Sequence, residues 1–218
     1  MQLCLDSLKV FKPDIQESAA RWDAFWQGEI IDRPVVLSSS PRPGYGFVGR
    51  DDYRSRAFGP IDEQIGHALH NAAGMVYGGD SIPSYWPSFA PDELAAYCGC
   101  EIIWPQEDHV ATNWAKPFVS DWEEALPLSV NQDGYFFQRM QEFYRQCAQR
   151  FEGRILTRTL DFHSNMDLLS AVRGSEELCI DLYDCPEAID RAMEDARSVF
   201  RLCWETCTRA GNMDEVGY

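Results

Sequence analysis

Residues 161 to 187 read DFHSNMDLLSAVRGSEELCIDLYDCPE, and this stretch decides the fold that the sequence predicts. A polar loop opens it. Short helices are expected over 166–172 and 176–182, separated at Gly174, where glycine permits a tight turn. A proline in the first turn then begins a last long helix, from 186 to about 209. The stretch therefore predicts a loop followed by three consecutive helices.

Upstream of this stretch, helices and strands alternate along the chain. The apolar spacing predicts helices over 14–26, 61–75, 92–97 and 133–150, a short buried strand over 33–37, a strand over 101–104 and a strand of mixed character over 154–160. This alternation is typical of α/β proteins with a largely parallel sheet and crossover helices. Such folds bind ligands at the loops that follow the carboxyl ends of the strands. Residues 38–49 and 161–165 are the two candidate loops.

The composition indicates a globular protein with an acidic surface. The chain has 218 residues, of which 45% are hydrophobic and 25% charged, and we expect a single domain over residues 1–218. It carries 19 basic and 35 acidic residues, a net charge of −16, which repels a phosphate backbone and argues against a nucleic-acid partner. No apolar run is long enough to span a bilayer and the amino terminus does not resemble a secretory signal, so we expect a cytoplasmic protein without a membrane partner.

The eight cysteines do not form a recognisable metal-binding motif. A C-x-C pair and a pair one helical turn apart are the nearest approach, and neither has a second half of the C-x-x-C type. We interpret the cysteines as reduced, small apolar side chains of the core, and we expect no metal site within this chain. The eight are Cys4, Cys98, Cys100, Cys147, Cys179, Cys185, Cys203 and Cys207.

Two further patterns do not indicate ligand sites. Residues 44–49 match G-x-G-x-x-G in letters, but the polar residues 50–54 do not predict the helix that would receive a pyrophosphate. His67 and His70 are three residues apart on a predicted helix, without a third ligand nearby in the sequence. We interpret them as two imidazoles with hydrogen-bond partners on a partly buried face.

The stretch from 161 to 187 resembles the uroporphyrinogen decarboxylase-like superfamily. Members commonly carry a D-x-x-x-x-x-D-x-L-x-x-L-R-G segment followed by a D-L-Y-D-x-P-E helix start. Residues 21–26 (RWDAFW) and 32–35 (DRPV) resemble the entry helix and first strand of the same group, and residues 114–125 (WAKPFVSDWEEA) resemble its middle segment. The resemblance covers nearly the whole chain.

The resemblance implies a (β/α)₈ TIM barrel, of which this chain would be the incomplete N-terminal part, because a complete barrel typically needs about 250 residues. The superfamily includes porphyrinogen decarboxylases and cobamide-dependent methyltransferases, which move methyl groups between a corrinoid and a thiol such as coenzyme M. We expect a fragment or a truncated paralogue of such an enzyme. The methyltransferases imply zinc and a corrinoid protein as partner.

The sequence departs from both branches of the superfamily. Where the decarboxylases carry an R-Q-A-G-R loop, residues 40–44 read SPRPG and keep one arginine, Arg42. Ser170 stands in place of their tyrosine, and their substrate-holding aspartate falls near Ala90. The His-x-Cys pair that holds zinc in the methyltransferases does not occur here, so the zinc ligands are not present in this chain.

Three classes of function remain open. We expect corrinoid- and thiol-dependent methyl transfer in the parent family, and this chain alone would be inactive if a second half is required. The alternatives are a non-catalytic ligand-binding or assembly module, and a decarboxylase of a small acid or porphyrinogen. An open half barrel leaves an unpaired parallel edge, so we expect a homodimer or larger assembly. The candidate catalytic residues are Asp161 and His163, and the candidate residues for a small-molecule substrate are Arg42, Tyr85, Trp86 and Trp104.

Overall fold

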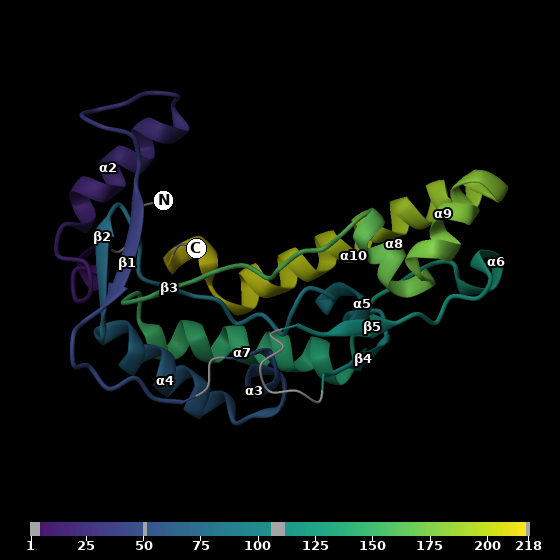
Figure 1. The fold of residues 1–218 in the computed structure, drawn as a ribbon, viewed down its shortest axis with the longest axis horizontal. Coiled ribbons are helices and arrows are strands. Elements are labelled where there is room, and N and C mark those ends of the chain that lie inside the picture. Colours follow the sequence, from purple (N-terminus) through teal and green to yellow (C-terminus); the bar gives the residue numbers. More distant parts are fainter. Residues whose placement is uncertain (1–4, 50–51, 106–111, 217–218) are drawn as a thin grey trace.

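The computed structural model describes residues 5–49, 52–105 and 112–216 (Figure 1). Helices make up most of the regular structure. In chain order they are α1 (Leu5–Leu8), α2 (Ile15–Trp26), α3 (Tyr53–Phe58), α4 (Ile61–Ala73), α5 (Glu93–Tyr97), α6 (Trp122–Ala125), α7 (Tyr135–Phe151), α8 (Met166–Arg173), α9 (Ser175–Asp184), α10 (Pro186–Ala210) and α11 (Met213–Val216).

The strands of the described residues pair two by two. β1 (Leu37–Pro41) runs antiparallel to β2 (Met75–Gly79), and β4 (Glu101–Ile103) runs antiparallel to β5 (Trp114–Lys116). β3 (Ser84–Tyr85) runs parallel to β6 (Leu156–Thr157). Further backbone hydrogen bonds, from the amide of Leu156 to the Pro83 carbonyl and from the amide of Arg158 to the Tyr85 carbonyl, extend this parallel pair at both ends.

The main core lies between the long helices. α7 packs against α10, α4, α5 and β6, and Figure 1 shows α7 and α10 running side by side along the molecule. Phe143 and Tyr144 of α7 and Cys203 and Cys207 of α10 are fully buried. With Met140 and Cys147, the buried residues of α7 recur at helical spacing, as Cys203 and Cys207 do in α10, which places them on one face of each helix. We call α4, α5 and α7 to α10 the helical body.

A second region projects from one end of this body, and we call α1, α2, β1 and β2 the ribbon arm (Figure 1). Its small apolar core contains Leu8, Ile15 and Leu156 among the described residues. The ammonium group of Lys12, whose side chain is 1% exposed, donates hydrogen bonds to the carbonyls of Tyr77 (3.0 Å) and Gly79 (2.7 Å). These bonds attach the segment between α1 and α2 to the edge of β2.

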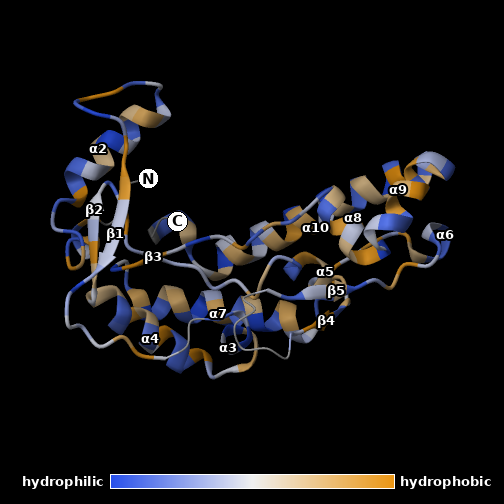
Figure 2. Ribbon diagram, viewed as in Figure 1, coloured by the Kyte–Doolittle hydropathy of each residue, from blue (hydrophilic) through white to orange (hydrophobic). Residues whose placement is uncertain are grey.

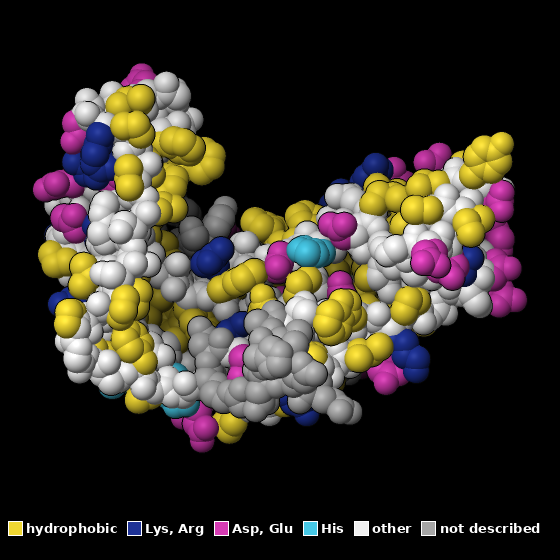
Figure 3. Space-filling view, viewed as in Figure 1, with side chains coloured by type: hydrophobic (Ala, Val, Ile, Leu, Met, Phe, Trp, Pro, Cys, Tyr) yellow, Lys and Arg dark blue, Asp and Glu magenta, His cyan; other side chains and the backbone are white. Residues whose placement is uncertain are grey.

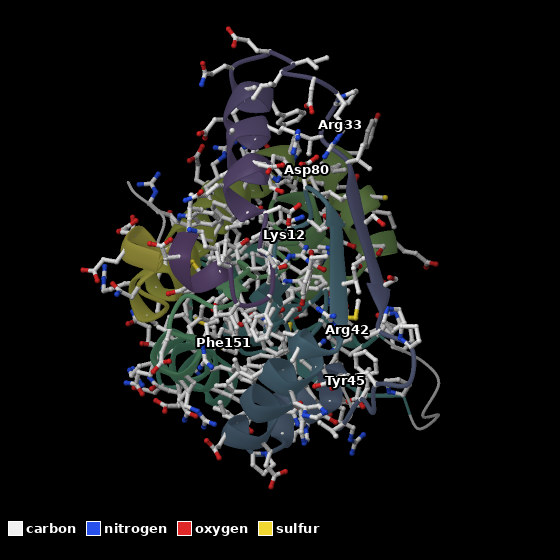
Figure 4. All side chains as sticks on the ribbon, turned by 90° about the vertical axis from the view of Figure 1, so that its left-hand side faces the viewer. Lys12, Arg33, Arg42, Tyr45, Asp80 and Phe151 are labelled. Atoms are coloured by element: carbon white, nitrogen blue, oxygen red, sulfur yellow. The ribbon has the colours of Figure 1, made fainter. Side chains whose placement is uncertain are left out.

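A buried carboxylate holds the other end of the ribbon. Asp80, with a fully buried side chain, accepts hydrogen bonds from Arg33, from Arg21 (3.3 Å) and from the amide of Val36 (3.0 Å). The Arg33 guanidinium beside Asp80 lowers the pKa of this carboxyl to about 2. Figure 4 shows Arg33 beside Asp80 at one end of the ribbon and Arg42 toward the other.

The prediction of a buried strand over 33–37 is wrong. The observed strand begins later, at Leu37, and it is exposed. Val36 exchanges hydrogen bonds with Asp80, so the ladder begins only at Leu37. The strand β1 then includes Ser38 to Ser40, which were expected to open a loop, and all five of its residues are exposed. Antiparallel pairing with β2 supplies hydrogen-bond partners for this polar segment, so it needs no buried face.

The predicted helices are confirmed, with ends shifted by at most two residues, but the predicted sheet is not. A largely parallel sheet was expected, and the described residues contain one parallel pair, β3 and β6. The chain leaves β3, passes through α5, β4, β5, α6 and α7, and returns to pair with β3 at β6. The two parallel strands are therefore joined by a crossover that contains helices. Within the described ranges, no helix is both long enough and apolar enough to cross a membrane.

Candidate functional site

The loops that follow β3 and β6 lie at one edge of the parallel pair. β3 ends at Tyr85 and leads into a segment that reaches α5 at Glu93, and β6 ends at Thr157 and leads to Asp161. Because the two strands are parallel, these loops meet at their carboxyl ends, where α/β folds commonly bind ligands. We call this edge the candidate site.

Asp161 and His163 form a pair at the candidate site. Their side chains approach to 3.4 Å between His163 Nε2 and Asp161 Oδ1. The imidazole is 44% exposed and the carboxylate 28% exposed, so both groups are accessible to a substrate. A histidine in contact with an acidic side chain is a common arrangement for proton transfer in enzyme sites.

Arg158 brings a cation to the same edge. Its backbone is fixed, because its amide donates to the Tyr85 carbonyl (2.8 Å) and its own carbonyl accepts from the Tyr144 hydroxyl (2.9 Å). The exposed guanidinium lies over the Trp86 ring, 5.0 Å from its centre. Within the described parts of the chain, no carboxylate pairs with it. In a protein of net charge −16, such an arginine can bind an anionic group.

Behind the edge, Glu93 is a buried carboxyl group, 3% exposed. It accepts hydrogen bonds from the Ser88 hydroxyl, the Phe89 amide (3.0 Å) and the Tyr97 hydroxyl (2.7 Å). Burial raises the pKa of Glu93 to about 7, against the lowering effect of these three donors. The negative charge of Asp161 raises this pKa further, so the two carboxyl groups interact. A carboxyl group that titrates near neutral pH is suited to general acid–base catalysis.

Polar side chains from α3 complete the surroundings of Glu93. Arg56, which is buried, donates from Nε to the Ser88 carbonyl (2.7 Å) and lies over the Tyr53 ring, 5.0 Å from its centre. Burial raises the pKa of Tyr53, and the charges of Asp161 and Glu93 contribute in the same direction. Three segments distant in sequence therefore bring titratable groups together at this edge.

The cavity beside Glu93 is very small. It has a volume of about 10 Å³, enough for a single water molecule, and Trp104 and Asn113 form part of its wall. Asn113 donates to the Phe89 carbonyl (3.0 Å), and its buried Oδ1 has no hydrogen-bond partner among the described residues. A substrate must therefore bind on the outer side of the edge, and not beside Glu93.

The remaining predicted substrate residues do not gather at one place. Trp86 lies at the candidate site, and Trp104 lies at the cavity beside Glu93. Tyr85 is buried, with its ring stacked against Phe143 at 6.2 Å between centres, so much of this ring belongs to the core. Arg42 lies at the foot of the ribbon arm, and its Nε donates to the Ala73 carbonyl (3.1 Å). Within the described ranges, no hydrogen bond or ion pair joins Arg42 to Asp161 or His163.

The loop after Asp161 also forms one wall of a second cavity. Ser164 and Asn165 line a pocket of about 440 Å³ with Arg201 and Trp204 of α10. Asn165 has φ +56° and ψ −126°, a sparsely populated conformation for a residue with a side chain. Two exposed arginines therefore lie near this loop, Arg201 at the second cavity and Arg158 at the end of β6. Of these two, Arg158 belongs to the candidate site, because it lies in the segment that leads from β6 to Asp161.

The residues described do not fit the zinc and corrinoid that the resemblance implies. No three His, Cys, Asp or Glu side chains gather as metal ligands in the described ranges. Burial raises the pKa of Cys98 and Cys207 to about 12, as expected for thiols that are packed in an apolar core. The pocket of 440 Å³ is also smaller than a corrinoid. We therefore derive no step through either group.

Comparison with models of protein families, with curated proteins and with solved structures found no match.

Sequence reasoning missed Glu93, Arg158 and Arg56. The segment around Glu93 reads as an ordinary helix start, in which an acidic residue is common. One signal was available, because Glu93 and Tyr97 lie one helical turn apart on a helix whose other residues are apolar. Arg158 was included in the predicted strand 154–160, and its position at the carboxyl end could have marked it for the site.

Proposed function

We propose that the edge formed by the carboxyl ends of β3 and β6 binds a small anionic substrate and transfers a proton to or from it. The observation that carries this proposal is the Asp161–His163 pair, together with Arg158 at the end of β6, for which no carboxylate partner occurs within the described residues. Arg158 would hold the anionic group, with Trp86 beneath it. His163 would exchange a proton with the reacting atom, and Asp161 would stabilise the imidazolium form.

Glu93 supports the same chemistry from behind the edge. Its carboxyl group has a pKa of about 7, so it holds or releases a proton in the range where an imidazole does. It is a positioning residue in this proposal, because it lies under the Ser88–Phe89 segment and interacts with Asp161 through charge. Its ionisation would change the charge that Asp161 and His163 experience.

For the reaction itself we propose methyl transfer to a small anionic thiol, in line with the resemblance to the uroporphyrinogen decarboxylase-like superfamily. The described residues would contribute one step of it. The S–H bond breaks, its electron pair stays on sulfur as the thiolate, and the proton passes to His163. The thiolate would then form the C–S bond to the methyl group of a separate methyl donor, which leaves with the electron pair of its own bond to that carbon. For the fold we propose what the same resemblance implies, namely that β3 and β6 are neighbouring strands of an incomplete (β/α)₈ barrel.

Arg158 also favours a second reaction, decarboxylation of a small acid. The C–C bond to the carboxylate would break, carbon dioxide would leave, and the electron pair on carbon would accept the proton of His163. Both reactions need the same cation and the same proton carrier. They differ in the substrate, so binding measurements can separate them.

The test is calorimetric titration with 2-mercaptoethanesulfonate and with malonate at pH 7. We expect the thiol to bind and its thiolate absorbance to appear on binding. Arg158→Gln should weaken binding about tenfold, since a charge-assisted contact contributes about 1.5–3 kcal/mol. Arg42→Gln is the matched control, and it should leave the affinity unchanged because its guanidinium is bonded to Ala73.

The outcomes separate the alternatives. Tighter binding of malonate than of the thiol would favour decarboxylation. His163→Asn should abolish the thiolate signal while leaving the affinity within about threefold, because the anion is held by Arg158. Binding of neither probe, or equal effects of Arg158→Gln and Arg42→Gln, would contradict the proposed site.

A second candidate function is assembly with another copy of the chain, and the surface of the ribbon arm favours it. Trp26 is 78% exposed, Ile30 68% and Leu37 64%, and Figures 2 and 3 show apolar segments and side chains gathered over this arm. Large exposed apolar patches mark interaction sites. We expect a dimer by light scattering, and Trp26→Glu should shift it to the monomer. A monomer in the wild type would contradict this candidate.

We also propose a cytoplasmic location. All seven cysteines in the described residues are free thiols. Free, buried cysteines are typical of proteins kept under reducing conditions. A full set of reactive thiols after unfolding of the purified protein, without reductant, would support this location.

A further inference from the structure

A further pocket lies between α4, β2 and β3. It is separate from the candidate site and from the cavity of 440 Å³ beside α10. It has a volume of about 290 Å³, close to the lower end of the range for small-molecule sites. Both residues of β3, Ser84 and Tyr85, line it, whereas the candidate site lies beyond the carboxyl end of that strand. The proposed function makes no use of this pocket.

The loop from Arg42 to Gly49 forms one wall, and side-chain hydrogen bonds attach it to α4. The Tyr45 hydroxyl donates to the His70 carbonyl (2.8 Å), and His70 Nε2 contacts the Gly46 carbonyl (2.8 Å). Asn71 exchanges two hydrogen bonds of 3.0 Å with the backbone of Val48. Figure 4 shows Arg42 and Tyr45 at this end of the ribbon, beside α4. The wall is therefore a fixed part of the fold.

His67 lines this pocket, and one of its two ring nitrogens is an unused polar atom. Its Nδ1 is buried and has no hydrogen-bond partner among the described residues. His70 has such a partner and His67 does not, so the expectation that both imidazoles are satisfied holds for His70 alone. A buried nitrogen without a partner costs free energy, which a ligand that donates a hydrogen bond would recover.

The pocket is polar but carries no charged side chain. Gln64, Asn71 and Ser84 line it together with the phenol of Tyr77. Burial raises the pKa of Tyr77, so this environment disfavours a negative charge. Aromatic rings and apolar side chains form the rest of the wall, which suits a flat ring system.

We propose that this pocket binds an uncharged bicyclic aromatic ligand that carries one N–H donor, and that the donor bonds His67 Nδ1. The amide and hydroxyl groups of Gln64 and Ser84 would fix the remaining polar atoms. The volume of the pocket limits the size of the ligand, the uncharged lining favours a neutral one, and the unpartnered nitrogen of His67 calls for a hydrogen-bond donor. An anion would find no cation among the lining residues.

Gly49 provides a sharp test, because its Cα faces the imidazole. A Cβ at Gly49 would lie 2.0 Å from His67 Nδ1, so Gly49→Ala must displace the ring. Gly44→Ala is the matched control. Gly44 has nearly the same backbone angle, φ +74° against +69°, and nothing lies within 4 Å of its added Cβ. Both substitutions carry the strain of a positive φ, and only one reaches the pocket.

The experiment is titration of the full chain with indole, and with 1-methylindole, which lacks the donor. We expect saturable binding of indole with a shift of the His67 Nδ1 resonance in nitrogen-15 spectra. Methylation of the ligand, and separately His67→Phe, should each weaken binding about tenfold. Gly49→Ala should weaken it at least about tenfold, and Gly44→Ala less than about twofold.

Three results would overturn the proposal. The first is equal affinity for indole and 1-methylindole, which would exclude a hydrogen bond to Nδ1. The second is equal loss of binding in the two glycine variants, which would indicate a general effect on the loop. The third is no saturable binding of indole up to its solubility. If Gly49→Ala does not fold, His67→Phe and 1-methylindole still decide the question.

Discussion

In the helical body, α7 and α10 bury whole apolar faces, whereas the ribbon arm leaves most of its apolar side chains exposed and buries charged ones. The core of the body includes fully buried rings such as Phe143 and Tyr144. The small core of the arm consists, among the described buried residues, of Leu8 and Ile15 packed with Leu156 of β6. Its attachment depends on Lys12 and Asp80, each held by several hydrogen bonds.

This difference predicts two modes of failure. Loss of apolar volume should destabilise the body in proportion to the cavity created, because packed interiors relax only partly. Loss of one charged group should detach the arm, because its partners would then be buried without compensation. The arm can therefore open while the body stays folded.

The largest effect is expected for Phe143→Ala in the body. Phe143 is fully buried and packs against the rings of Tyr85 and Phe89, each at 6.2 Å between centres. The substitution should lower the free energy of unfolding by about 4 kcal/mol, measured by chemical denaturation. Phe25→Ala on the arm is the control. Its ring is 50% exposed, so the loss should stay below about 1 kcal/mol. Similar losses would contradict the contrast between the regions.

A smaller effect is expected for Asp80→Asn, and it should be confined to the arm. Removal of the charge leaves Arg33 and Arg21 without their buried partner, at a cost of about 3 kcal/mol. We expect faster hydrogen exchange at the amides of β1 and β2 and unchanged exchange in α7 and α10, which would show that the opening is confined to the arm. Asp32→Asn is the control, because Asp32 contacts the same Arg21 but is half exposed. Equal exchange in both regions would mean one cooperative unit.

The same carboxyl sets the behaviour of the arm in acid. Because the folded-state pKa of Asp80, about 2, lies below its ordinary value, the stabilisation is present above pH 4 and is lost as the pH falls toward 2. Asp80→Asn should remove this acid-dependent opening of the arm.

The smallest effect is expected for Glu93→Gln, and it should appear as a changed pH profile. The pKa of Glu93 is raised to about 7, so the full stability is present below pH 4.5 and falls as the pH rises to 7. The wild type should lose on the order of 2 kcal/mol over this range, and the variant should not. Chemical denaturation at several pH values measures this change in the free energy of unfolding. Parallel profiles for the two proteins would show that Glu93 does not titrate there.

The sequence predicted the body well and the arm poorly, for a physical reason. The helices over 133–150 and 186–209 show apolar residues at a spacing of 3.6, and burial on the core gives that pattern. The apolar run Val35–Leu37 shows the pattern of a buried strand but lies on an exposed ribbon. Its position depends on Asp80, more than forty residues away, and local patterns do not report such a contact.

The candidate site was predictable in part. Asp161 and His163 follow a predicted strand, and the rule that ligands bind after carboxyl ends selects them. Arg42 follows a predicted strand too, but that segment pairs antiparallel to β2 and ends beside α4. Glu93 enters the site only through the crossover from β3 to α5, and its raised pKa depends on burial that only the assembled fold creates.

Lys12 makes the attachment of the arm measurable without any substitution. The sequence contains three lysines, Lys9, Lys12 and Lys116, and the side chains of the other two are 40% and 62% exposed. An amine-reactive reagent should therefore modify Lys9 and Lys116 at once in the native protein. Lys12 can react only after its bonds to Tyr77 and Gly79 break, so its labelling rate reports how often the arm opens.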